Sequence, residues 1–127
     1  MIEHHERKIS PIGWYIASYL LRLVELKDPK KDDLEQRFLS WENSVLIQAR
    51  SIQEAFDKVV RIAVAETEPY KGGEDVVDVQ WVFEGVTEVL PIYEALEDGS
   101  ELMWCERFPR KLKNLRRLVI DRRSLQS

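Results

Sequence analysis

Residues 76–104 read VVDVQWVFEGVTEVLPIYEALEDGSELMW, and this stretch decides the fold. Apolar and polar residues alternate in its first half, the apolar members being Val77, Val79, Trp81 and Phe83. A period of two predicts a β-strand with one face on a core and the other in water. We expect this strand to bend near Gly85 and, because proline cannot donate to a ladder, to end by about residue 90.

The second half of the stretch predicts a turn and a further strand. Asp98-Gly99 supplies a residue that can adopt positive φ. The alternation then restarts at Leu102, Trp104 and Phe108. We therefore expect two strands joined through this turn.

Two more strands are predicted upstream. Trp14–Leu26 is apolar on both faces, which is typical of a strand at the centre of a sheet or against a second layer or subunit. Lys27–Asp33 is a charged loop, and Leu34–Ala49 is the returning strand. The polar run Glu42–Ser44 inside it indicates either a bulge or an edge position.

One helix is predicted to begin after Ser51. Ser51 and Glu54 have the spacing of a capping box, in which the serine oxygen accepts from the Glu54 amide and the Glu54 carboxylate accepts from the Ser51 amide. Apolar residues follow at helical spacing, namely Ile52, Ala55, Phe56, Val59 and Ala63. Glu66–Asp75 is then expected to be a loop.

The order strand–strand–helix–strand–strand predicts an α+β two-layer sandwich, with a four-stranded, mainly antiparallel sheet, one main helix and a basic C-terminal helix or extension. We expect a flexible N-terminus at 1–12, a single α+β domain at 13–108, and a basic amphipathic C-terminal segment at 109–127. One helix covers such a sheet incompletely. The C-terminal segment or a second subunit is therefore expected to cover the remaining apolar surface.

Length and composition favour a single soluble domain in the cytoplasm. The chain has 127 residues, of which 44% are hydrophobic, and it contains four tryptophans. The single cysteine excludes an intramolecular disulfide framework, and no apolar run follows the charged start. No stretch reaches the roughly 20 apolar residues that span a bilayer, so no membrane span is expected.

The charge is divided unevenly. Residues 107–127 hold eight basic residues and one acid, whereas residues 1–106 hold 11 basic and 22 acidic residues. Seven of the basic residues are candidates for binding a partner: Arg110, Lys111, Lys113, Arg116, Arg117, Arg122 and Arg123. The partner is expected to be the body of the same chain, a second copy in a homodimer, or another protein.

The C-terminal segment has two alternative local structures. Apolar residues at approximate helical spacing after Pro109 predict an amphipathic helix, although Leu118–Ile120 equally suits a short strand. A basic amphipathic helix also suits a membrane surface or nucleic acid. Against nucleic acid, no aromatic residue follows Phe108, and the acidic body would repel phosphate.

The sequence provides little for catalysis. His4 and His5 are adjacent and have no accompanying cluster of ligands, and Cys105 has no histidine base nearby in the sequence. The pair Gly72-Gly73 lacks the context of a phosphate-binding loop. Carboxylates crowd the central stretch, but nearly all fall on polar phases of strands or in turns, where solvation explains them. We therefore assign no catalytic residue, cofactor or metal, and expect no enzyme.

Three short patterns together resemble a known family. They are Trp14-Tyr15-x-Ala17, Ser51-x-x-Glu54-Ala55, and Trp81-x-Phe83-x-Gly85-Val86 followed by Leu96-x-Asp98-Gly99-x-Glu101-Leu102. Over Gly13–Met103 the chain resembles a family of small bacterial proteins catalogued only as a domain of unknown function. The resemblance implies a compact sheet-and-helix domain and transfers no catalytic residue.

The leading hypothesis is a non-enzymatic protein–protein interaction module that acts as a homodimer. One alternative is an acidic inhibitor of the kind that toxin-neutralising immunity proteins represent. A second is a small-ligand binder or carboxylate-dependent enzyme with a pocket between helix and sheet, and a third is nucleic-acid binding through the basic segment. Convergent buried carboxylates would favour the enzyme, and a broad apolar surface would favour the interaction module.

Overall fold

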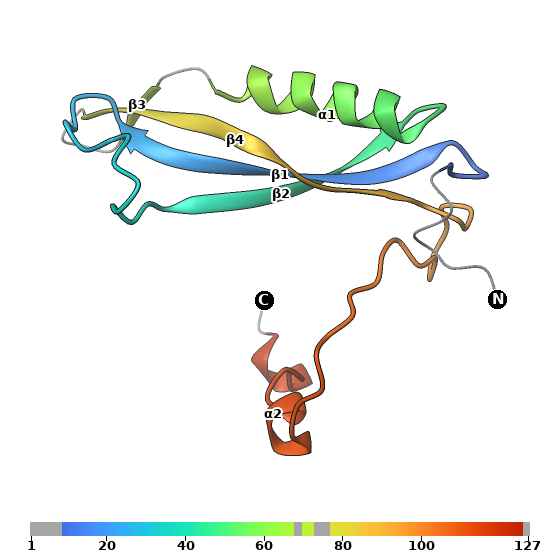
Figure 1. Ribbon diagram of the computed structural model, residues 1–127. Helices are drawn as coiled ribbons and strands as arrows, with labels where there is room; N and C mark the ends of the chain where they lie inside the picture. Colours follow the sequence, from blue (N-terminus) through green and yellow to red (C-terminus); the bar gives the residue numbers. More distant parts are fainter. Residues whose placement is uncertain (1–8, 68–69, 73–76, 126–127) are drawn as a thin grey trace.

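The computed structural model describes residues 9–67, 70–72 and 77–125 of the chain. Three long antiparallel strands form the sheet: β1 (Trp14–Glu25), β2 (Ser40–Gln48) and β4 (Val77–Pro91). A short strand, β3 (Tyr70–Gly72), pairs with the start of β4, so the order across the sheet is β2-β1-β4-β3. The helix α1 (Ile52–Ala65) lies on one face of this sheet (Figure 1). The fold class is α+β, as predicted.

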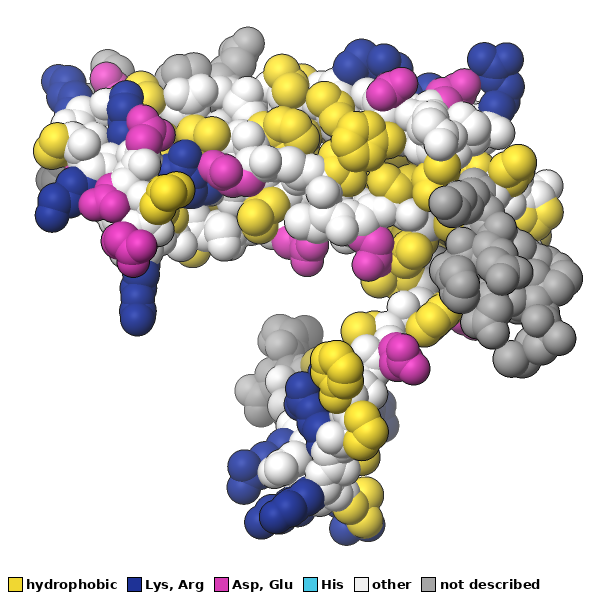
Figure 2. Space-filling model, viewed as in Figure 1, with side chains coloured by type: hydrophobic (Ala, Val, Ile, Leu, Met, Phe, Trp, Pro, Cys, Tyr) yellow, Lys and Arg dark blue, Asp and Glu magenta, His cyan; other side chains and the backbone are white. Residues whose placement is uncertain are grey.

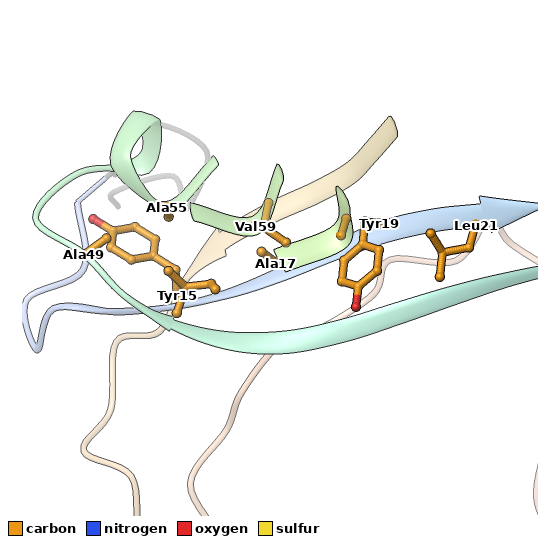
Figure 3. Packing of buried hydrophobic residues seen from close by; sticks show 9 residues of the cluster. Tyr15, Ala17, Tyr19, Leu21, Ala49, Ala55 and Val59 are labelled. Carbon is orange, nitrogen blue, oxygen red and sulfur yellow. The ribbon is translucent and has the colours of Figure 1, made fainter. Parts of the chain in front are cut away.

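Strand β1 is the centre of the fold. It pairs with β2 on one side and with β4 on the other, which confirms the central position predicted from its two apolar faces. Its odd-numbered side chains face α1, and Figure 3 shows Tyr15 and Ala17 packed near Ala55 and Val59 of the helix. The core lies between these two elements.

The start of α1 follows the prediction in part. Ser51 Oγ accepts a hydrogen bond from the Glu54 amide at 3.1 Å. The Glu54 carboxylate, however, accepts from the amide of Arg50 at 3.4 Å and from Arg50 Nε at 3.2 Å, rather than from the Ser51 amide. Burial raises the pKa of Glu54, but these hydrogen bonds outweigh it and leave the pKa below its usual value.

Helix α1 is too short to cover the whole of β1. Its 14 residues span about 21 Å, whereas the 12 residues of β1 span about 40 Å. The helix ends beside Tyr19, whose hydroxyl donates to Glu66 Oε1 at 2.5 Å. Beyond Tyr19, Trp41 of β2 pairs with Leu21, and Trp81 of β4 pairs with Leu23. The two indole rings contact each other with their centroids 4.7 Å apart and their planes tilted by 35°. The two indoles therefore pack on the part of this face that lies beyond the end of the helix.

Strand β4 bends where the sequence predicted. Its register against β1 shifts twice, between Ser18 and Tyr19 and between Leu20 and Leu21. Gly85 lies between the two shifts with a φ of 155°, which an L-residue rarely adopts. The strand ends at Pro91, close to the predicted end.

The predicted strand from Leu102 to Phe108 is wrong, so the four-stranded sheet is not confirmed in the form we expected. Gly99 takes positive φ in a turn, as predicted, but no strand follows it. An alternating pattern becomes a strand only where its backbone meets a ladder partner. The chain leaves β4 at Ile92 and does not return along that strand, so this stretch finds no partner. Strand β3 instead lies within the predicted loop Glu66–Asp75.

Strand β2 begins later than predicted. Residues 27–39 form turns rather than the first part of the strand, and the Asp28 carboxylate fixes one turn by accepting from Gln36 Nε2 at 3.0 Å and from the Lys30 amide at 2.8 Å. The polar run Glu42–Ser44 carries no register shift. Of the two predicted explanations for that run, the edge position is therefore correct.

Replacing Tyr19 with phenylalanine tests the link between β1 and the end of α1. Burial, followed by the hydrogen bond to Glu66, raises the pKa of Tyr19 above its usual value of 10.0. We expect Tyr19→Phe to lower the free energy of unfolding by about 1 kcal/mol at pH 7. Because the folded-state pKa is the higher one, this stabilisation is complete below pH 10 and is lost as the pH rises through the folded pKa.

Urea unfolding of both proteins at pH 7 and above pH 10 measures this effect. The difference in unfolding free energy between the two proteins should shrink at the higher pH. A difference that stays constant would contradict the assigned hydrogen bond.

Candidate functional site

Among the described residues, no helix lies on the face of the sheet opposite α1. Even-numbered residues of β1 and their register partners form it, and one row crosses three strands as Leu46, Ile16 and Leu90. Leu46 is 48% exposed, and the other two are half-buried. We call this surface the open face, and its apolar members are Trp14, Ile16, Leu20, Leu46 and Leu90.

A loop closes one end of this face of the sheet. Arg22 Nε lies 2.6 Å from Glu84 Oε2, and the guanidinium sits 4.5 Å above the centre of the Phe38 ring. A second guanidinium nitrogen donates to the carbonyl oxygen of Lys31. These contacts hold residues 26–39 to the sheet near Val24, which is buried. The open face is therefore confined to the other end.

Polar groups interrupt and flank the apolar row. The Ser18 and Ser44 hydroxyls lie 2.6 Å apart and satisfy each other. Glu42 of β2 is opposite Leu20, and Glu88 of β4 is opposite Ser18; both side chains are exposed. Figure 2 shows acidic side chains along the lower margin of the body. The open face thus combines an apolar strip with carboxylates on both sides.

The C-terminal segment, which was predicted as a basic helix or extension over residues 109–127, is only partly helical. Its described part holds a five-residue helix, α2 (Leu112–Arg116), and a short 3₁₀ turn, η2 (Arg122–Ser124), while Leu118–Ile120 forms no strand. In the part of the chain that the structure describes, α2 contacts no strand and no other helix. Without a surface to bury its apolar side, so short a helix has little reason to extend.

Apolar side chains are exposed throughout this segment and the stretch before it. Phe108 is 89% exposed and Val119 is 76% exposed. The seven candidate partner-binding residues are also exposed, and none of them forms an ion pair with another described residue: Arg110, Lys111, Lys113, Arg116, Arg117, Arg122 and Arg123. Figure 2 shows these two kinds of side chain together below the body. The structure brings the candidates into one segment, away from the sheet.

A shallow groove of about 440 Å³ runs between the first turns of α1 and the outer edge of β4. Ile52, Phe56, Val86 and Val89 supply its apolar lining. Asp57, on the α1 side of the groove, is exposed to solvent; Glu88 also borders the groove, but its pairing with Ser18 turns its side chain to the open face. The groove can take an apolar group, but it offers no buried acid for proton transfer.

The described residues contain no cluster of histidine, cysteine and carboxylate side chains that could hold a metal ion. His4, His5 and Gly73 lie outside the described residues. Cys105 is exposed. Among the described residues, no helix has the length and apolar character needed to cross a membrane.

The fold and its surfaces define a class of protein: a small α+β domain with an antiparallel sheet covered by one helix. A family model described as "Domain of unknown function (DUF4288)" matches residues 14–104, which is well over half of the chain. The chain belongs to this family, as the resemblance of its sequence motifs implied. Comparisons with curated proteins and with solved structures found no match. The matched range starts at the first residue of β1 and ends before the C-terminal segment.

Sequence reasoning missed Arg22, which anchors the loop that closes one end of the sheet. The available signal was a single cation inside an otherwise apolar strand. We expect Arg22→Met to lower the free energy of unfolding by about 1–3 kcal/mol, because it leaves Glu84 without its cation and releases the loop.

Chemical denaturation of this variant checks the expectation, with Arg37→Met as the matched control. Arg37 is an exposed arginine in the same loop, so its replacement should change the unfolding free energy by less than about 0.5 kcal/mol. Equal losses of unfolding free energy in the two variants would show that Arg22 does not anchor the loop.

Proposed function

We propose that this domain is a non-enzymatic protein–protein interaction module that acts as a homodimer. The observation that carries the proposal is the open face, where Leu46, Ile16 and Leu90 form an apolar row that no described helix covers, on a sheet whose other side packs against α1. Exposed apolar surface that is contiguous and rimmed by polar groups marks interaction sites in monomeric proteins.

The distribution of charge supports the same proposal. The body is strongly acidic and the C-terminal segment is basic. Complementary charge steers two partners together and fixes their register. A second copy of the chain carries both signs, so it satisfies this requirement without any other protein.

The groove between α1 and β4 gives less support to a catalytic function. Its acid, Asp57, is exposed, whereas acid–base catalysis at neutral pH generally needs a carboxyl whose environment shifts its pKa. An apolar groove of this size also suits a side chain of a protein partner. We therefore place the enzyme and the small-ligand binder behind the interaction module.

A charged substitution on the open face tests the proposal. We expect the full chain to have twice the monomer mass by multi-angle light scattering, and Leu46→Lys to weaken self-association at least about tenfold. Val64→Lys is the matched control, since Val64 is exposed to a similar extent (51%) but lies on α1. A monomeric full chain, or equal effects of the two variants, would refute dimerisation through the open face.

A further inference from the structure

In the part of the chain that the structure describes, no helix or strand packs on the open face or on the C-terminal segment, and each supplies what the other lacks. We propose that they exchange between copies, so that Lys111–Ile120 of one chain docks as a helix on the open face of the second chain, and the reverse. This inference rests on the proposed homodimer and specifies which surfaces form it.

The apolar pattern of the segment fits the shape of the open face. Extending α2 from Arg116 to Val119 would place Leu112, Leu115 and Val119 on one side of the helix. With the helix laid along β1, that seam would lie over Ile16 and Leu20 of β1, and Leu46 and Leu90 would lie on either side of Ile16. Beside Leu20, Gly85 has no side chain, and the space where a Cβ would project is empty. The backbone beside Leu20 is therefore bare, which leaves room for a leucine of the helix.

The charges fit as well as the apolar groups. Neighbouring strands lie about 4.8 Å apart, so Glu42 on β2 and Glu88 on β4 are separated by about 10 Å across β1 and, because Glu42 is opposite Leu20 and Glu88 is opposite Ser18, by about 7 Å along it. An α-helix with its side chains is about 10 Å wide. On the extended helix Lys111 and Arg116 flank the apolar seam, one on each side, so each would reach one carboxylate.

The place where the chain leaves the sheet lets the C-terminal segment reach a second copy. The Ile92 amide donates to the Trp14 carbonyl at 2.9 Å, and Ser10 Oγ donates to the Ile92 carbonyl, so the segment departs from a fixed point at the end of the sheet. Figure 1 shows the C-terminal segment on the side of the sheet away from α1, where it does not lie on its own sheet. Extended, the chain from Ile92 to Leu112 reaches about 65 Å, which is ample for a neighbour. Exchange about a twofold axis would cover both open faces with one type of contact.

Disulfide trapping between two full-length variants tests the exchange. Cys105 is the only cysteine of the chain, so Cys105→Ser gives a clean background. One variant then carries Leu46→Cys and the other Leu115→Cys. We expect mild oxidation of the mixture to link one copy of each variant. Replacing Leu46→Cys by Val64→Cys on α1 should give less than about a tenth of that product.

The outcomes separate this inference from the proposed function. A chain carrying both Leu46→Cys and Leu115→Cys that links only within itself would show that the segment covers its own sheet, which overturns the exchange. Absence of any link, with a dimer mass retained in light scattering, would overturn the docking but leave the homodimer in place. A monomer mass for the unmodified chain would remove both.

Charge reversal supplies an independent readout. We expect Lys111→Glu with Arg116→Glu to weaken the dimer about tenfold, and mixing with Glu42→Lys, Glu88→Lys chains to restore it. Lys113→Glu with Arg117→Glu is the control, because these residues lie on the opposite side of the extended helix. If the control weakened the dimer equally, general attraction rather than docking would explain the effect, and the exchange would be refuted.

Discussion

The uneven covering of β1 is the constraint on which the rest of this structure depends. This strand is apolar on both faces, and each face needs a neighbour to remove it from water. Helix α1 supplies one on the odd-numbered face, where Tyr15, Ala17 and Tyr19 are almost completely buried. On the even-numbered face, the described residues close only the end near Arg22. The open face is therefore the remainder of a sheet built for two layers of cover.

The two ends of β1 are protected by different means. Near Arg22 the loop of residues 26–39 is held by an ion pair and by the Phe38 ring, on the face opposite α1. On the other face, Trp41 and Trp81 continue the cover where α1 ends. Both devices act on the half of the sheet that α1 does not reach. At the start of β1 the even-numbered face has neither the loop of residues 26–39 nor the indole pair. Ile16 lies there half-buried, and Leu46 lies there exposed.

The fold could be predicted from the sequence wherever local pattern and tertiary packing agree. The two faces of β1, the bend at Gly85 and the serine cap of α1 each follow from residues close together in the chain. The strand at Leu102 was mispredicted because its alternation is genuine but its ladder partner is missing. Strand β3 was missed because three residues carry too little pattern to be recognised before β4 is placed beside them.

The same reasoning explains why the C-terminal basic residues could be predicted from the sequence and the open face could not. The basic residues could be counted from the sequence, but the open face depends on which strands pair and in which register. Ile16, Leu46 and Leu90 are far apart in the chain, and only the sheet aligns them. The apolar spacing after Pro109 left a helix and a short strand open, and in the described part of this segment only Leu112–Arg116 forms an α-helix. A helix whose apolar side packs on no other element lacks most of the free energy that would extend it, so apolar spacing alone could not decide the local structure of this segment.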